Sequence, residues 1–240
     1  MIITVTNQKG GVGKTTLACH LAWRAAEDGT CLAVDLDTQA NLTQTLLGRT
    51  VGIPGDAAGI FGDESLSPTP VSERLSLLPG GAELKEIDEG VELREAIDRR
   101  ARIKDLADVI VIDTPPAIGV RQVAPYFWSD ILVLVLSPDV FSLKGMVDVR
   151  NTLERVRTKN PGLLLRVVVN RHHPDVSREK EIIDLIAREF GDDLVRPVLA
   201  ESRSISGAVS ERVSAWDYSY KSPVRAKAIR DVCETILKIV

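Results

Sequence analysis

Five short, near-continuous aliphatic runs recur along the chain, at residues 2–6, 31–36, 109–112, 131–136 and 163–169. Strands with helices on both faces have this composition, whereas strands with one face in water alternate apolar and polar residues. Helical patterns, with apolar positions three or four residues apart, fill the intervals between the runs. This alternation predicts an α/β fold: a doubly wound, mostly parallel sheet with helices on both faces.

Three helical stripes lie in the second half of the chain. Apolar residues at positions 146, 149, 153 and 156 predict a helix that ends before Pro161-Gly162. Those at 182, 183, 186 and 190 predict a helix with Gly191 as its C-cap, and those at 229, 232, 236 and 240 predict a last one. Residues 74–78 form a weaker candidate strand. Residues 51–70 are rich in Gly, Pro, Ser and Asp, which is typical of a long surface connection.

The composition indicates a folded chain with a sizeable core. Of the 240 residues, 44% are hydrophobic and 27% are charged, which excludes a disordered or fibrous protein. The net charge of −4 does not suggest that the chain as a whole binds nucleic acid. The longest aliphatic run, 131–136, is far shorter than the roughly 18 residues of a membrane span, and the N-terminus lacks the pattern of a signal peptide. We therefore expect a soluble, cytoplasmic protein.

The three cysteines, Cys19, Cys31 and Cys233, lie far apart and form no C-x-x-C pair. This spacing disfavours a zinc knuckle, a redox dithiol or a cysteine-ligated iron–sulfur cluster within the chain. An odd number of scattered cysteines is typical of a reducing compartment such as the cytosol.

A glycine-rich segment, Asn-Gln-Lys-Gly-Gly-Val-Gly-Lys-Thr-Thr at residues 7–16, joins the first expected strand to a helix expected from Thr15 to about Glu27. Glycines let the backbone curl so that successive N–H groups point inward at phosphate oxygens. The helix adds the positive end of its dipole. In such a loop Lys14 reaches the β- and γ-phosphates, the Thr15 hydroxyl ligates Mg²⁺, and Thr16 is placed for the α-phosphate.

The segment departs by one residue from the strict phosphate-loop pattern G-x-x-x-x-G-K-[ST], because Gln8 stands where the first glycine is required. It has instead a second lysine, Lys9, and a Gly10-Gly11 pair. The alternative interpretation is an ordinary glycine turn with two surface lysines. The order of strand, loop and helix favours the phosphate loop.

Residues Lys9-Gly10-Gly11-Val12-Gly13-Lys14-Thr15 resemble the deviant Walker A motif of the ParA/MinD family of P-loop ATPases, most of all the ParA/Soj partition ATPases. The resemblance implies a P-loop fold that binds ATP and Mg²⁺ through residues 9–16. In that family the first lysine crosses a dimer interface to the other subunit's nucleotide, which makes Lys9 the trans lysine and Lys14 the in-chain one. A second cation stabilises the charge that develops on the phosphoryl group, and it couples ATP binding to homodimerisation.

Residues 35–41 resemble the family's switch I, whose usual form is D-x-D-P-Q-x-N. The resemblance implies that Asp37 is catalytic, positioning the attacking water, and that Asp35 lies nearer the magnesium shell. Thr38 replaces the usual proline, so we expect a less rigid loop, but no catalytic group is changed. The alternative role for Asp37 is to cap a helix over residues 41–47.

Residues 109–116 resemble the family's Walker B and switch II segment. The resemblance implies that Asp113 holds Mg²⁺ through water, since this ion keeps several waters and takes few carboxylates. Pro115 and Pro116 forbid an immediate helix and give a stiff turn. The alternative is that Asp113 caps the next helix.

Asn170 follows the fifth aliphatic run, at the place of the family residue whose amide reads the adenine edge. An amide suits this task because it donates and accepts hydrogen bonds at once. The alternative is an asparagine in a turn. His172 and His173 are adjacent and precede Pro174, which is no metal-ligand spacing, so we interpret both as loop residues.

The family divides into members that work on nucleoid DNA and MinD-like members that work on membranes. Residues 231–240 hold one lysine, two acids and no aromatic, which predicts a core helix and no stable membrane association. Residues 196–230 hold seven basic and three acidic residues in an otherwise acidic chain, which favours nonspecific DNA binding. The candidate DNA contacts are Arg203, Arg212, Lys221, Arg225, Lys227 and Arg230. The alternative is a solvated face with ordinary ion pairs.

The sequence thus predicts one P-loop ATPase domain over residues 1–240, in a cytoplasmic, nucleoid-associated ATPase of the ParA type. We expect ATP to close a homodimer that binds DNA nonspecifically. A ParB-like protein or cargo adaptor would then stimulate hydrolysis, so as to partition or position a plasmid, chromosome or protein cargo. The first alternative is a MinD-like membrane switch. The second is a metabolic P-loop enzyme such as a dethiobiotin-synthetase-like ligase, in which Lys9 would act within its own subunit. No helix-turn-helix segment precedes the phosphate loop, so we do not expect an operator-specific repressor.

Overall fold

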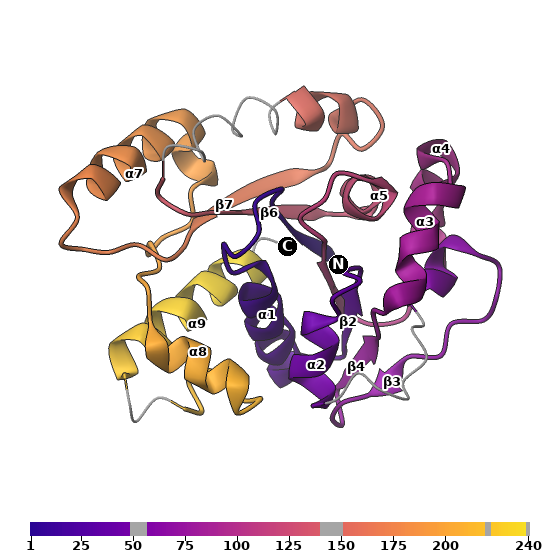
Figure 1. Cartoon of the computed structure of the whole chain (residues 1–240), viewed down its shortest axis with the longest axis horizontal. Coiled ribbons are helices and arrows are strands. Elements are labelled where there is room, and N and C mark those ends of the chain that lie inside the picture. Colours follow the sequence, from indigo (N-terminus) through magenta and orange to yellow (C-terminus); the bar gives the residue numbers. More distant parts are fainter. Residues whose placement is uncertain (49–56, 140–150, 219–221, 239–240) are drawn as a thin grey trace.

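The computed structural model describes residues 1–48, 57–139, 151–218 and 222–238 (Figure 1). Within these ranges seven strands form one sheet in the order β3-β4-β2-β5-β1-β6-β7. The strands are β1 (Ile2–Thr6), β2 (Cys31–Asp35), β3 (Thr69–Pro70), β4 (Leu75–Leu78), β5 (Val109–Asp113), β6 (Ile131–Leu136) and β7 (Leu164–Val169). All neighbours pair in parallel except β3 with β4. The predicted mostly parallel α/β sheet is confirmed.

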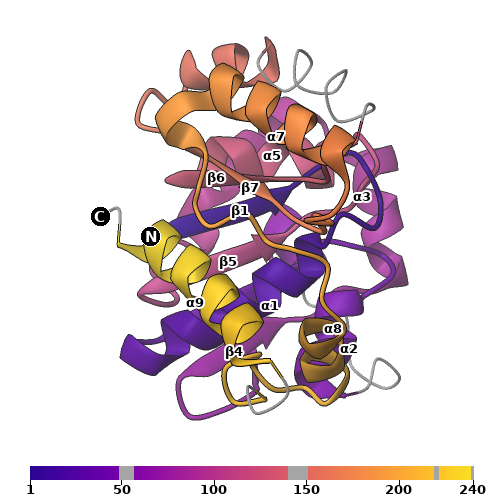
Figure 2. The same ribbon diagram turned by 90° about the vertical axis from the view of Figure 1, so that its left-hand side faces the viewer.

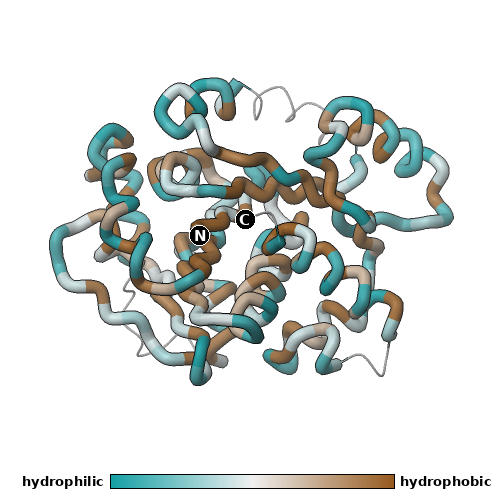
Figure 3. Tube along the Cα trace, turned by 180° about the vertical axis from the view of Figure 1, so that it is seen from behind, coloured by the Kyte–Doolittle hydropathy of each residue, from teal (hydrophilic) through white to brown (hydrophobic). Residues whose placement is uncertain are grey.

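Helices cover both faces of this sheet. They are α1 (Lys14–Asp28), α2 (Asn41–Leu47), α3 (Lys85–Gly90), α4 (Leu93–Ala96), α5 (Val120–Trp128), α7 (Ser177–Phe190), α8 (Arg203–Ser210) and α9 (Pro223–Leu237). Figure 2 shows α5 and α7 on one side of the sheet and α1, α8 and α9 on the other. The apolar side chains of the strands therefore lie between two helical layers. The trace in Figure 3, coloured by hydropathy, is mostly hydrophobic along the central strands and alternates between hydrophilic and hydrophobic along the outer helices.

The aliphatic runs become strands in which most positions are buried, the exceptions including the half-buried Val109 of β5 and the exposed Leu164 of β7. All six residues of β6 are buried, as are all five of β1 and of β2. Since these strands run in parallel, the loops that follow β1, β2, β5 and β7 leave the same edge of the sheet. Ligands of open α/β sheets bind at this carboxyl edge, and the candidate residues of the loops meet there.

The helix at the C-terminal end packs into the core, as predicted. Ala226, Ile229, Val232, Cys233 and Ile236 form the buried stripe of α9, which lies along α1. The predicted position 240 of this stripe lies outside the described residues. No helix in the described part of the chain is both long and apolar enough to span a bilayer.

Several elements differ from the predictions. The segment expected to be one long connection, residues 51–70, contains a 3₁₀ helix at Ala57–Phe61 and the short strand β3, while residues 51–56 lie outside the described ranges. Helices α3, α4, α5 and α8 are not predicted, because they are short and carry no long aliphatic stripe. The predicted C-cap of α7, Gly191, is confirmed with φ of 51°. Of the stripe at 146–156, Met146 and Val149 are not described, and Leu153 and Val156 are buried.

Candidate nucleotide-binding site

A cavity of about 560 Å³ opens at the carboxyl edge of the sheet. Its walls come from the glycine loop and first turn of α1, from the loop before α2, from the end of β7, and from α8. Its lining includes the predicted residues Lys14, Thr15, Thr16, Asp37 and Asn170. Pro116, at the end of the predicted 109–116 segment, lines it as well, so the structure brings four of the predicted segments around one space.

The glycine loop is held in a conformation that excludes other residues at its tightest point. Gly13 has φ of 97° and Gly11 has φ of 75°, both in the left-handed region that side chains disfavour. A Cβ on Gly13 would lie 2.2 Å from Nδ2 of Asn170. That same Nδ2 donates a 2.9 Å hydrogen bond to the carbonyl of Val12. Asn170 therefore fixes the loop to the end of β7, and its amide lies at the cavity wall.

Lys14 is the buried cation of the loop. Its side chain is 7% exposed, and its Nζ donates a 3.3 Å hydrogen bond to the carbonyl of Lys9. Burial lowers its pKa, and the carboxylates of Asp113 and Asp37 oppose this shift. The lysine thus lies among fixed backbone dipoles with two carboxylates near enough to influence its charge.

Asp113 and Thr15 form a pair that fits a divalent cation. The Thr15 hydroxyl donates a 2.6 Å hydrogen bond to Oδ2 of Asp113, at the end of β5. The other oxygen, Oδ1, is buried and has no hydrogen-bond partner among the described residues. Burial, and then repulsion from Asp35, raises the pKa of Asp113 to about 8. A buried carboxylate oxygen needs a partner, and Mg²⁺ binds through one or two carboxylates while it keeps several waters.

The described residues contain no cluster of three or more His, Cys, Asp or Glu side chains that could enclose a metal ion by themselves. A pair made of one hydroxyl and one carboxylate agrees with the way Mg²⁺ is held at phosphates, where substrate oxygens supply further ligands. Thr15 and Asp113 are therefore the residues present that fit this ion.

The Asp35 carboxylate contacts the loop before α2 and the start of that helix, whereas the Thr15 hydroxyl is bound by Asp113. Its Oδ2 accepts 2.8 Å hydrogen bonds from both the N–H and the hydroxyl of Thr43, and its Oδ1 accepts one of 3.1 Å from the N–H of Asp37. The side chain is fully buried, which raises its pKa to about 6. The Asp35 side chain therefore orients the loop that carries Asp37. Its backbone lies beside that of Asp113, because the two residues are partners in the pairing of β2 with β5.

Neither of the two aspartates considered as helix caps has that role. The N-cap of α2 is Ala40, with φ of 51°, and no side chain caps it. Asp37 instead lies at the cavity, where its Oδ1 accepts a 3.0 Å hydrogen bond from the N–H of Gln39. The N-cap of α5 is Gly119, so Asp113 does not cap that helix either.

The two lysines of the loop lie in different surroundings. Whereas Lys14 lines the cavity, Lys9 is not among its lining residues. The Nζ of Lys9 donates to the Ser137 hydroxyl at 3.2 Å and forms an ion pair with Asp139, just beyond β6. Its side chain is 43% exposed. Lys9 therefore faces the surface of its own chain and lies outside its own cavity.

Arg171 and Glu201 are part of the site and were not predicted. Arg171 has φ of 62°, and its Nη1 donates a 2.5 Å hydrogen bond to the carbonyl of Gly11. Its Nε donates to Glu201 at 2.7 Å, which raises the pKa of the arginine. Both residues line the cavity. In the sequence, Arg171 is marked by its position just after the fifth aliphatic run, and Glu201 is a single acidic residue thirty positions later. These signals are too weak to select the pair.

The two adjacent histidines are loop residues, as predicted. His172 and His173 lie between β7 and α7, where their Nδ1 atoms share the Glu179 carboxylate at 3.2 and 3.1 Å. Glu179 lies in the first turn of α7 and also accepts a hydrogen bond from the N–H of His173. The pair therefore anchors the start of this helix.

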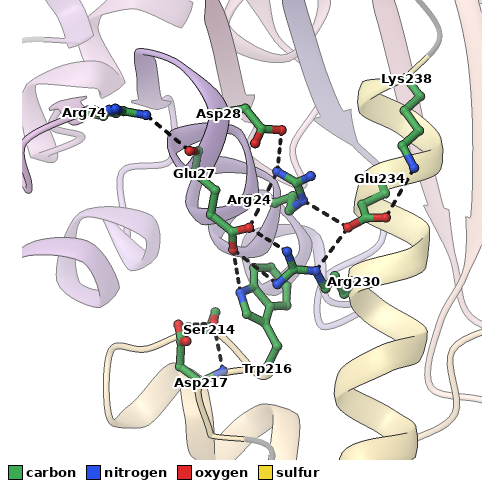
Figure 4. A network of polar contacts seen from close by, with 10 residues as sticks. All are labelled: Arg24, Glu27, Asp28, Arg74, Ser214, Trp216, Asp217, Arg230, Glu234 and Lys238. Atoms are coloured by element: carbon green, nitrogen blue, oxygen red, sulfur yellow. Dashed lines mark hydrogen bonds and ion pairs between the residues drawn. The ribbon is translucent and has the colours of Figure 1, made fainter.

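Some of the candidate DNA-binding residues already form contacts within the protein. Arg203 begins α8, Arg225 and Lys227 lie on α9, and Lys221 lies outside the described residues. Arg230 is half-buried and held by neighbouring residues: it forms ion pairs with Glu27 at 2.7 Å and Glu234 at 3.1 Å, and its guanidinium lies over Trp216 (Figure 4). Lys227 forms an ion pair with Asp231 at 2.6 Å, and the guanidinium of Arg212 packs on Gly48. The expected basic surface is thus partly used by internal contacts.

Comparison with known proteins agrees with this geometry. A family model described as an AAA domain matches residues 1–165. The chromosome partitioning protein ParA of Caulobacter vibrioides is 28% identical over 225 residues, which are 87% of this chain and 84% of that protein. Among solved structures, Cyanothece apo McdA has a TM-score of 0.84 with 18% identity and 98% coverage of both chains. Cobyrinic acid a,c-diamide synthase of Mycobacterium smegmatis, with bound ATP analogue and magnesium, has a TM-score of 0.82 with 21% identity and covers 99% of this chain and 94% of that one.

A parallel sheet whose first strand passes through a glycine loop into a helix, with a strand-end aspartate on the threonine of that helix, defines a P-loop nucleotide-binding protein. The comparisons narrow the class further. The chain belongs to the ParA/MinD family of P-loop ATPases.

Proposed function

We propose that the chain is a ParA-type ATPase that binds ATP with Mg²⁺, closes into a homodimer and hydrolyses ATP to ADP and phosphate. The observation that carries the proposal is the Thr15–Asp113 pair at the first turn of α1, in which Oδ1 of Asp113 has no hydrogen-bond partner in the part of the chain that the structure describes. Oxygen donors arranged in this way beside a phosphate loop serve nucleotides whose phosphates are bound with a metal ion.

The residues of the chain provide each element of an in-line attack by water on the γ-phosphate. The backbone N–H groups of the glycine loop and the start of α1 favour the phosphate oxygens. Lys14 adds a cation that is already buried and in place before the reaction. Asp37, at the cavity wall, orients the water. When bound, Mg²⁺ neutralises charge on the phosphate oxygens, and Thr15 and Asp113 would hold it.

We further propose that Lys9 acts in the site of the partner subunit. It does not line its own cavity, and its exposed Nζ has polar contacts to Ser137 and Asp139. A surface ion pair contributes about 0–1 kcal/mol, so exchanging it for phosphate oxygens across a dimer costs little. Dimerisation would in this way depend on the nucleotide.

We propose nonspecific DNA as the surface on which the dimer works, with the protein in the cytoplasm and on the nucleoid. The buried apolar stripe of α9 supports DNA over a membrane, since that stripe packs on α1 and is not presented to solvent. Arg203 and Arg225, with Arg212, Lys221 and Lys227, are the proposed contacts. A ParB-like protein or cargo adaptor would stimulate hydrolysis and release the dimer, which would partition or position a plasmid, chromosome or protein cargo.

A DNA mobility assay tests this function. It is run with ATP, with ADP and without nucleotide, at several salt concentrations. DNA binding that occurs only with ATP and depends steeply on salt supports the proposal. Equal DNA affinity with ATP, with ADP and without nucleotide contradicts it. Co-sedimentation with liposomes in ATP would favour a MinD-like switch instead. Hydrolysis by a monomer that does not need Lys9 would favour a metabolic enzyme.

A further inference from the structure

Arg121 is a buried residue that joins three segments around the candidate site. It lies in the first turn of α5, directly after the loop that follows Asp113, and its side chain is 7% exposed. Its Nε and Nη2 donate hydrogen bonds of 2.9 and 2.7 Å to Oδ2 of Asp88, in α3. Its Nη1 donates one of 2.9 Å to the carbonyl of Leu36, the residue before Asp37. One guanidinium therefore connects α5, α3 and the loop of Asp37.

The peptide group between Leu36 and Asp37 is held at both of its polar atoms. Its carbonyl accepts the hydrogen bond from Arg121, and its N–H donates a 3.1 Å hydrogen bond to Oδ1 of Asp35. The preceding N–H, that of Leu36, donates to the carbonyl of Asp113 at 3.0 Å. Because a peptide group is planar, two fixed atoms set its orientation. The direction in which the chain enters Asp37 is thereby determined by Arg121 and Asp35.

Asp88 holds Arg121 from two sides. Besides the two bonds to the guanidinium, its Oδ1 accepts a 3.1 Å hydrogen bond from the backbone N–H of Arg121. A Cβ on Gly119 would lie 2.5 Å from the same Oδ1, so the glycine gives this carboxylate its place at the start of α5. The side chain and backbone of Arg121 are thus both fixed by one aspartate.

An arginine suits this position better than a lysine. Its planar fork can donate to a carboxylate with two nitrogens while the third donates to a carbonyl, and its charge does not titrate in proteins. A lysine has one nitrogen on a flexible stem, so it can keep the ion pair with Asp88 or the contact with Leu36 but not the same fixed geometry.

We propose that Arg121, held by Asp88, is a positioning residue for ATP hydrolysis: it fixes the Leu36–Asp37 peptide and so keeps the Asp37 carboxylate in place to orient water. This inference rests on the proposed function, since it assumes that Asp37 orients the attacking water. Arg121 acts through Asp37 and does not touch the nucleotide. It also couples the two loops, because it lies in the first turn of α5, where the loop that begins after Asp113 ends.

The test compares single-turnover ATP hydrolysis with ATP affinity in three variants. In Arg121→Lys and in Asp88→Asn, we expect the rate of hydrolysis to fall about 10- to 100-fold, as a small misplacement of a catalytic group does. Affinity for a fluorescent ATP analogue with Mg²⁺ should change less than about twofold, because neither residue lines the cavity. Arg100→Lys is the matched control: it alters another arginine–aspartate pair, Arg100 with Asp130 at 2.6 Å, and should leave the rate unchanged.

A double-variant cycle separates positioning from general damage. In an Asp37→Ala background, Arg121→Lys should lower the residual rate no further, because residues that act as a unit are not additive. A further tenfold loss in that background would overturn the inference, and so would a parallel loss of affinity and rate. If Arg121→Lys does not fold, Asp88→Asn takes its place in the cycle, because the asparagine keeps an oxygen that can accept the hydrogen bond from the backbone N–H of Arg121.

The failure of this inference can be distinguished from the failure of the proposed function. If Asp37→Ala stops hydrolysis while Arg121→Lys and Asp88→Asn hydrolyse at the original rate, the positioning role alone is wrong. If Asp37→Ala hydrolyses ATP as fast as the unmodified chain, the proposed role of Asp37 is wrong, and the role of Arg121 is overturned with it.

Discussion

The imidazole Nε2 of His20 accepts a 3.1 Å hydrogen bond from the backbone N–H of Ala215. Its other nitrogen, Nδ1, lies 2.7 Å from the carbonyl of Thr16, to which it donates in this tautomer. His20 lies in α1, two turns from the glycine loop, and Ala215 lies in the connection between α8 and α9. A neutral, fully buried ring therefore joins the nucleotide side of the fold to the proposed DNA side.

This bridge predicts that the fold loses stability in mild acid. Burial lowers the pKa of His20 to about 4, from 6.5. The unfolded chain thus binds the proton first, and the contribution of the neutral ring is complete above pH 6.5 and declines as the pH falls towards 4. We expect this residue to account for about 2 kcal/mol of the free energy of unfolding lost between pH 7.5 and pH 5. Urea denaturation at both pH values, with and without His20→Gln, measures it.

The control for the acid effect is Leu185→Gln, which changes an exposed side chain of α7 that carries no titratable group. This variant should keep the pH dependence of the unmodified chain. An identical pH dependence in His20→Gln and the unmodified chain would contradict the assignment. The comparison between variants cancels the contributions of Asp35 and Asp113, which have raised pKa values.

The geometry of the glycine loop predicts that alanine lowers the free energy of unfolding more at Gly13 than at Gly10. Gly13→Ala places a Cβ 2.2 Å from Asn170 and forces φ of 97° on an alanine, so the free energy of unfolding should fall by about 2 kcal/mol or more. Gly10→Ala is the matched control, since a Cβ there meets nothing within 4 Å and φ is not in the left-handed region. Chemical denaturation of both variants without nucleotide checks the expectation. Equal losses would contradict the loop geometry.

Asp37→Ala should leave ATP binding intact and trap the dimer. Removing the carboxylate that orients water should lower the rate of hydrolysis about 100-fold or more, while the phosphate contacts remain. Size-exclusion chromatography with ATP and Mg²⁺ should then show a persistent dimer. Wild-type turnover in this variant would show that another group orients the water.

Lys9→Ala should weaken dimerisation and hydrolysis more than it weakens nucleotide binding, because Lys9 does not line its own cavity. The readouts are the shift in elution volume caused by ATP and the affinity for a fluorescent nucleotide. Lys180→Ala, at an exposed position of α7, is the control. If Lys9→Ala keeps the full ATP-dependent shift, the proposed trans role is wrong.

The proposed DNA surface predicts which arginines affect salt dependence. Arg203→Ala and Arg225→Ala should each weaken ATP-dependent DNA binding and reduce the slope of log affinity against log salt by about 1 if each contacts one phosphate. Arg178→Ala, at an exposed position of α7 on the other face of the sheet, should have no effect. Equal changes in all three variants would contradict a surface confined to α8 and α9.

Much of the sheet could be predicted because a strand covered on both faces needs aliphatic residues at every position. The run at 131–136 coincides with β6, and the run at 163–169 exceeds β7 by one residue. The glycine loop was predictable for a similar reason: its left-handed residues leave a glycine signature. Lys14, Thr15 and Asp113 could then be placed by the order of strand, loop and helix.

The contacts that hold the site could not be predicted in this way. Arg121 and Asp88 are 33 residues apart, and Arg171 and Gly11 are 160 apart, with nothing in the sequence that pairs them. Asp35 has the same chemistry as Asp37, yet one carboxylate is buried on Thr43 and the other lies at the cavity. The pattern of charges did not predict that Arg230 forms internal contacts, because Glu27 and Trp216 are distant in the sequence and come next to it only in the packed structure.

The packing of α9 along α1 gives the molecule a mechanical property. With 15 residues, α1 is roughly 22 Å long. It begins at the candidate nucleotide site, and its last turns meet α9 through Arg24, Glu27 and Arg230. A rod of this length that tilts by about 5° at the phosphate end moves its far end by roughly 2 Å. A tilt of α1 at its phosphate end would in this way become a displacement where α1 meets α9, with α1 as the lever arm.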